Sequence, residues 1–264
     1  MVGESNYGVC ALCLKNGTLK DSHLTPKWVY KRLRSVGNGT DDPVRVADGS
    51  ACMTSQQVKM FLLCGECEGR FSTREDYVAQ LTDDGAAKVF QHVRIVGESM
   101  AGAVELDRDG IDTDKLSYFA ISVIWRSGFI DGGCQLGKYA EQFRKYLLGE
   151  DEFPRFAALT MTIVGPSGKG AGNGDVHNMY TQPSSARDGL LWFHGFSLFG
   201  LVFRCFVGQA LESDWKEQLC LAGPNGKKYA LLQSAGQCAD HRCAIDALMK
   251  AQPRGKLRQK IGTG

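Results

Sequence analysis

The sequence lacks a dominant charge, a long apolar run and a leader-like start. Its 31 Lys and Arg residues nearly balance its 29 Asp and Glu residues, so the net charge of +2 identifies no anionic partner and any basic surface must be local. The most apolar window, residues 189–203, is shorter than the roughly 20 residues of a membrane-spanning helix, and we expect buried strands there. No cationic stretch followed by an apolar run opens the chain. We therefore expect a cytoplasmic protein without a membrane partner.

Cysteine, by contrast, is plentiful. The chain has 10 cysteines, and because a reducing cytosol opposes a disulfide framework, metal binding or burial must account for them. Cys10 with Cys13, and Cys64 with Cys67, share the spacing C-x-x-C. Two such knuckles around a long insert predict a four-thiolate zinc site, which is closed and therefore structural. The alternative is four ordinary buried thiols.

The insert between the knuckles places one histidine near the end of an expected strand. Residues 18–24 can form this strand after a hairpin turn at Asn16-Gly17, and His23 lies near its end. Thr25 is a natural N-cap and Pro26 a natural first residue for the helix that follows. This helix carries cations that suit a phosphate backbone. They are Lys27, Lys31, Arg32 and Arg34.

A C-x-x-C, a strand ending in a histidine, and a second C-x-x-C whose last cysteine opens a helix together resemble the zinc-containing branch of the HNH, or ββα-metal, nucleases. The resemblance covers about residues 8–80. It implies that His23 is the general base that deprotonates water, and that magnesium or manganese stabilises the leaving oxygen and the charged transition state. The position after the final knuckle carries the cation in this family. Here it is Glu68, whose carboxylate suits a hard cation.

The chain departs from the family pattern directly before the base. Ser22 stands where the family has Asp or His, and Asp21 is one residue further back, on the opposite face of a regular strand. Asn38 is a candidate for the family's middle position by elimination only. A catalytically inactive zinc-ribbon module that contacts nucleic acid or a protein partner therefore stays open. For His23 itself, the alternatives to catalysis are a zinc-ligand role and an incidental turn histidine.

Glu75 has two interpretations. It lies two helical turns after Glu68, so both carboxylates can face His23, and Glu75 can hold the cation or orient the base, with Asp21 as another assisting group. Alternatively, Ser72-Thr-Arg-Glu75 fits the S-x-x-E capping box, which would place Glu75 at the start of a helix.

We expect the fold class α+β, with a small zinc-stapled ββα-metal module in residues 1–80 and a larger α+β domain in residues 81–264. Residues 116–127 have apolar positions at three- and four-residue spacing and predict a helix, whereas residues 155–164 predict a strand. The glycine-rich residues 164–178 lack the P-loop spacing and predict a loop. The basic tail, residues 250–264, predicts a mobile arm that adds phosphate contacts, with a functionless solvated tail as the alternative.

The expected activity is metal-dependent endonuclease hydrolysis of nucleic acid, with DNA as the expected substrate and the larger domain as the surface for any protein partner. The stretches "YFAISVIWRSG" and "LLCGECEGRFS" together resemble uncharacterised bacterial proteins with an HNH-like head, which implies a role in defence against foreign DNA. A second metal site at Cys238 and Cys243 around His241 would need further ligands nearby.

Overall fold

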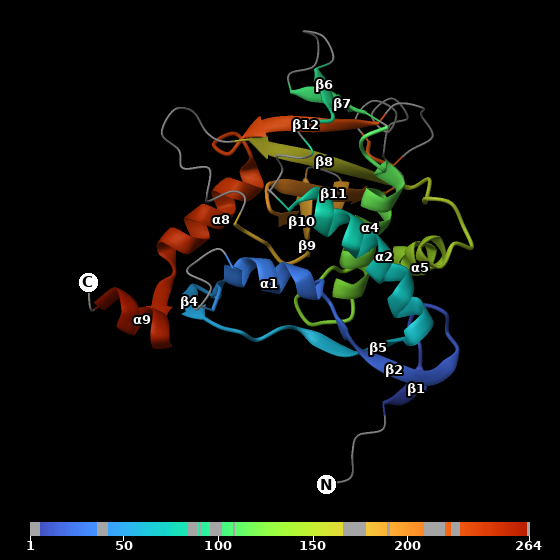
Figure 1. The fold of residues 1–264 in the computed structure, drawn as a ribbon, viewed down its shortest axis with the longest axis horizontal. Coiled ribbons are helices and arrows are strands. Elements are labelled where there is room, and N and C mark those ends of the chain that lie inside the picture. The colour runs from blue at the N-terminus through green and yellow to red at the C-terminus, as the bar shows by residue number, and fades with distance from the viewer. Residues whose placement is uncertain are drawn as a thin grey trace.

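The computed structural model describes residues 6–35, 42–83, 89, 91–95, 102–107, 109–165, 178–188, 191–208, 220–222 and 228–262. It confirms the α+β class: a small sheet-and-helix part at the N-terminus is followed by a larger sheet (Figure 1). Among these residues, no helix combines the length and the apolar character that crossing a membrane requires. Asn38 and nearly all of the glycine-rich loop lie outside the described residues.

The N-terminal part contains a ββα unit with a helix and a hairpin inserted in it. Its three-stranded antiparallel sheet has the order β1 (Tyr7–Val9), β2 (Asn16–His23), β5 (Lys59–Cys64). Helix α2 (Gly65–Leu81) begins directly after β5, with Cys64 at its N-cap. The insert between β2 and β5 holds α1 (Lys27–Ser35), β3 (Val44–Ala47) and β4 (Ser50–Met53).

The predicted strand near His23 is confirmed, but the predicted turn at Asn16-Gly17 is wrong. Both residues already lie in β2, where they pair with Val9 and Gly8. The chain reverses earlier, inside the first cysteine knuckle. There the amide of Cys10 donates to the carbonyl of Lys15 over 2.9 Å, and the knuckle rather than the Asn-Gly pair sets the register.

A seven-stranded sheet forms the larger part of the chain. Its neighbours are antiparallel except for β12 and β8, which run parallel. The order is β6 (Val93–Ile95), β7 (Ala103–Leu106), β12 (Tyr229–Ser234), β8 (Ala157–Gly165), β11 (Leu201–Val207), β10 (Leu191–Leu198), β9 (Ser184–Asp188). The apolar window thus forms strands, as predicted; β11 is buried along nearly all of its length and β10 only toward its C-terminal end. Phe199 and Gly200 both have positive φ at the β10–β11 turn, the backbone that a tight two-residue hairpin requires.

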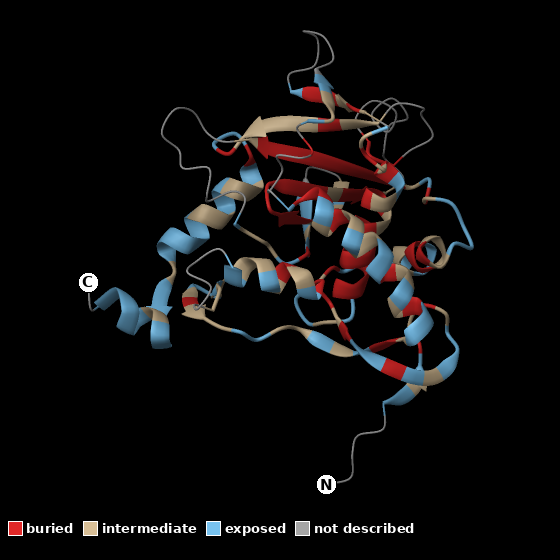
Figure 2. Cartoon of the chain, in the orientation of Figure 1, coloured by how far each residue is buried: buried red, intermediate tan, exposed pale blue. Residues whose placement is uncertain are grey.

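Helix α4 (Thr113–Ser127) joins the two parts of the molecule. It is buried along most of its length and lies against α2, β10 and α5 (Ala140–Leu148), which follows the short 3-10 helix η1 (Gly137–Tyr139). One continuous hydrophobic core extends from Cys10 and Leu12 in the first knuckle to Ala230 in β12. Figure 2 shows its buried residues concentrated in β8, β11 and α4. The division of the chain at residue 80 stays a prediction, and the core is continuous across it.

The C-terminal segment returns to the N-terminal part. Helix α8 (Ala239–Lys250) leaves the large sheet, β13 (Gln252–Arg254) pairs in parallel with β4, and α9 (Gly255–Gly262) packs beside both (Figure 1). The tail that we expected to be a mobile arm therefore has a strand partner in the insert of the ββα unit.

Candidate metal centre and active site

The four knuckle cysteines meet at one point. The sulfur atoms of Cys10, Cys13, Cys64 and Cys67 all lie within 4.8 Å of one another. The sulfur atoms of Cys13 and Cys64, from opposite knuckles, are 3.9 Å apart. Tetrahedral zinc with bonds of about 2.3 Å to sulfur separates its ligands by about 3.8 Å. The cluster therefore fits a structural metal such as zinc.

Backbone amides prepare this cluster for a cation. Burial raises the pKa of the Cys10 thiol, but hydrogen bonds from the backbone of Cys13, Cys64 and Leu12 and from the Cys13 thiol together outweigh burial and lower that pKa to about 7. The Cys64 amide donates to the Cys10 sulfur over 3.3 Å. Burial and the neighbouring thiols instead raise the pKa of Cys67. A divalent cation would complete the cluster, because only a positive charge lets adjacent thiols ionise together.

An irregularity in the pairing of β2 with β5, where Leu62 of β5 is the extra residue, accompanies the turning of Ser22 toward α2. The pairing register of β2 with β5 shifts between Lys20 and Asp21, and two consecutive exposed residues precede the fully buried Ser22. The Ser22 hydroxyl donates to Oε2 of Glu68 over 2.7 Å. Glu68 is thus positioned in the first turn of α2, with one carboxylate oxygen held by the strand that carries the candidate base.

The ring of His23 is oriented by Gln57, which the sequence did not reveal. Nε2 of His23 lies 2.7 Å from the amide oxygen Oε1 of Gln57. With the Gln57 amide oxygen as the acceptor, Nε2 carries the hydrogen and Nδ1 keeps the lone pair. This is the tautomer that accepts a proton at Nδ1. No hydrogen bond or ion pair among the described residues joins this ring to Glu68 or Glu75.

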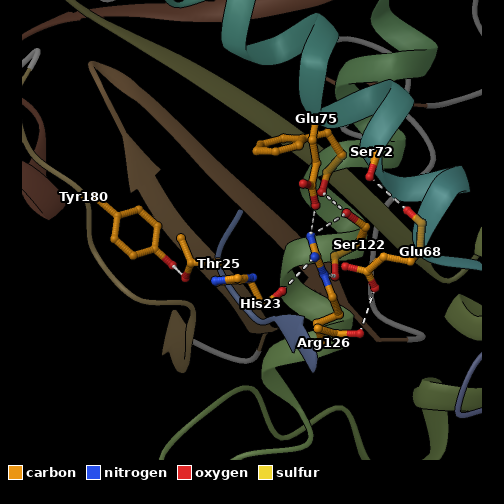
Figure 3. A network of polar contacts seen from close by, with 10 residues as sticks. His23, Thr25, Glu68, Ser72, Glu75, Ser122, Arg126 and Tyr180 are labelled. Carbon is orange, nitrogen blue, oxygen red and sulfur yellow. Dashed lines mark hydrogen bonds and ion pairs between the residues drawn. The ribbon is translucent and has the colours of Figure 1, made fainter. Parts of the chain in front are cut away.

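Glu75 forms an ion pair with a buried arginine from the larger part of the chain. Ser72 and Glu75 lie in the middle of α2, so the capping-box interpretation is wrong. The Glu75 carboxylate accepts from Arg126 of α4 over 2.6 Å, and Arg126 is 1% exposed. The same guanidinium donates to the backbone carbonyl of His23 over 2.8 Å and to the carbonyl of Ser122 (Figure 3). Arg126 therefore fixes the end of β2 against α2 and α4.

The other predicted site residues lie at the surface. Asp21 forms an ion pair with Lys59 of the neighbouring strand, and both side chains are more than 40% exposed. Lys27, Lys31 and Arg34 of α1 are exposed, as a phosphate-binding role requires. Arg32 differs, because it donates to the Asp83 carbonyl over 2.8 Å and lies over the ring of Phe199.

Replacing Arg126 with methionine is expected to lower the free energy of unfolding by about 3–5 kcal/mol, because it leaves the Glu75 carboxylate without its buried partner. Equilibrium urea unfolding measures the loss. The double variant Arg126→Met/Glu75→Gln should recover part of it, because the uncompensated charge is then gone. Equal losses in the single and the double variant would show that the ion pair does not hold this junction.

Two residues of this site had no sequence signal. Gln57 lies in an irregular segment before β5, far along the chain from His23, and Arg126 belongs to a helix that its apolar spacing identifies only as buried.

The candidate second metal site at Cys238 and Cys243 finds no further ligands among the described residues, where the knuckle cysteines form the one group of three or more metal-binding side chains. Comparison with protein-family models, curated proteins and solved structures found no match to this chain. What this protein does must therefore be inferred from its own residues.

Proposed function

We propose that this protein is a metal-dependent endonuclease of the ββα type, that it hydrolyses phosphodiester bonds in DNA, and that His23 is its general base. The observation that carries this proposal is the orientation of His23. Its ring stands at the end of β2 with Nε2 against the amide oxygen of Gln57, and in the tautomer that donates from Nε2, Nδ1 is left to take a proton from water. The adjoining β5 and α2, with the four-cysteine cluster at their junction, agree with the ββα frame that the sequence resembles.

Each residue has a defined task in this reaction. Nδ1 of His23 takes the proton of the attacking water, and the Gln57 oxygen stabilises the imidazolium through the Nε2 hydrogen. Ser22 holds Oε2 of Glu68, so Oε1 of the same carboxylate is the oxygen that would hold a cation. Magnesium or manganese, when bound there with substrate phosphate oxygens, would stabilise the charge that develops on phosphate and leaving group. Lys27, Lys31 and Arg34 would contact the phosphate backbone.

Gln57 is a positioning residue in this scheme. Gln57→Leu is expected to lower kcat/KM by about 10- to 100-fold, the typical cost of removing the partner that orients a functional histidine. Gln57→Glu keeps an acceptor and adds a negative charge, which raises the pKa of His23, so the rise of the pH–rate profile should move to higher pH. The profile of kcat/KM against pH measures both effects. The neighbouring exposed Gln56→Leu is the matched control, and a Gln57→Leu protein as active as that control would remove Gln57 from the scheme.

A second function is a zinc module that binds nucleic acid or protein without turnover. The contacts of the two carboxylates favour it: Glu68 already accepts from Ser22, and Glu75 already pairs with Arg126. Neither carboxylate has a hydrogen bond or an ion pair with His23 in the described part of the chain. This function predicts binding of DNA at every concentration of magnesium, with no cleaved product.

A further inference from the structure

The C-terminal arm, residues 250–262, is attached to the insert of the ββα unit by backbone pairing. In β13 and β4, Gln252 pairs with Ser50 and Arg254 with Cys52, and the Gln252 amide donates to the Gly49 carbonyl over 2.9 Å. Helix α9 then packs against β4. A segment far along the chain from α1 is thereby brought to the insert that also contains α1.

The arm is rich in positive charge. Its sequence "KAQPRGKLRQKIG" contains five cations and no acidic residue. The cations are exposed, and within the described residues no acidic group lies at ion-pair distance from Lys250, Arg254, Lys256 or Arg258. Like charges so close together repel one another, and an anionic partner relieves that repulsion.

The arm and α1 border the same hairpin. Arg34 at the end of α1 forms an ion pair of 3.3 Å with Asp42, just before β3. On the other side of this hairpin, β4 carries β13 and α9. Figure 1 shows β4 between α1 and α9. Exposed cations of α1, Arg45 of β3 and the arm thus follow one another across neighbouring elements.

We propose that the C-terminal arm is a second DNA-contacting element. It extends the cationic surface of α1 across the β3–β4 hairpin and contacts the phosphate backbone of the substrate. This inference rests on the proposed function, because it assigns the arm to the same DNA. Its contacts are to phosphates, so they add affinity and salt sensitivity and no base preference. Pairing of β13 with β4 holds the arm in place, since it ties α9 to the β3–β4 hairpin.

The test measures DNA binding without cleavage. In the full-length His23→Ala protein, binding of a labelled DNA duplex is followed by fluorescence anisotropy at several salt concentrations, with and without the added substitutions Lys256→Gln/Arg258→Gln. Each lost phosphate contact lowers the slope of log K against log salt by about 0.9, so the slope should fall by about 1.8. The matched control is Lys15→Gln/Lys138→Gln, which removes two exposed charges elsewhere and should leave the slope unchanged.

The outcomes separate the arm from the nuclease. A lower slope in the arm variant supports the arm even when the wild-type protein cleaves no DNA, a result that overturns the nuclease alone. Equal slopes in the arm variant and the control overturn the arm, whether or not the wild type cleaves. A parent protein that binds no duplex also overturns the proposed role of the arm. A change in the oligomeric mass of the arm variant, measured by light scattering, overturns that role as well. It would indicate that a second copy of the chain docks at the exposed Met249 and Ile261. Equal thermal unfolding midpoints of the parent protein, the arm variant and the control variant verify that all three are folded.

Discussion

Replacement of Cys67 with serine is expected to abolish zinc binding and to unfold the N-terminal part of the chain. Cys67 is 1% exposed and belongs to the same hydrophobic core as Leu12 and Phe71. A structural zinc site contributes an apparent binding free energy of about 10–16 kcal/mol in small zinc domains, which is as large as the whole stability of a typical domain. Zinc content by atomic emission and the thermal unfolding midpoint check this prediction.

Another cysteine provides the control for this loss. Cys243 is an exposed thiol on α8, so Cys243→Ser should keep the zinc content and midpoint of the wild-type protein. Chelation of zinc from the wild-type protein should reproduce the Cys67→Ser effect, since both remove the same cross-link. A Cys67→Ser protein that retained one equivalent of zinc and an unchanged midpoint would exclude the four-thiolate site.

Replacement of His23 with alanine is expected to lower the cleavage rate by about 10²- to 10⁴-fold, the usual contribution of a general base. The fold should survive, because Arg126 donates to the backbone carbonyl of His23, which alanine retains. Nicking of supercoiled plasmid with magnesium, manganese or a chelator measures the effect, beside the zinc content of both proteins.

A second histidine distinguishes a specific effect from a general one. His241 lies on α8, outside the ββα unit, so His241→Ala should cleave at the wild-type rate. Cleavage that survives in His23→Ala would remove His23 from the mechanism. Loss of activity in both variants would show that the loss comes from impaired folding. A zinc-loaded wild-type protein that nicks nothing under any of these conditions would instead favour the binding module.

Local patterns in the sequence determined much of the frame. Two C-x-x-C knuckles identified the cysteine cluster, because a knuckle is a short turn whose geometry depends on few neighbours. The strand ending at His23 and the helix that opens at the second knuckle also followed from local spacing. Strand β11, which begins in the apolar window, did as well, since burial of both faces requires a continuous apolar run.

The tertiary structure decided what each polar side chain does. The sequence presented Glu75 as a cation ligand or a helix cap, and the structure pairs it with Arg126, which lies 51 residues further along the chain. Gln57 became the partner of the His23 ring, and Arg254 came to lie beside β4, through contacts between segments distant in sequence. Periodicity predicts which face of an element is buried. It does not predict which distant polar group satisfies a buried charge, because that depends on how the elements pack.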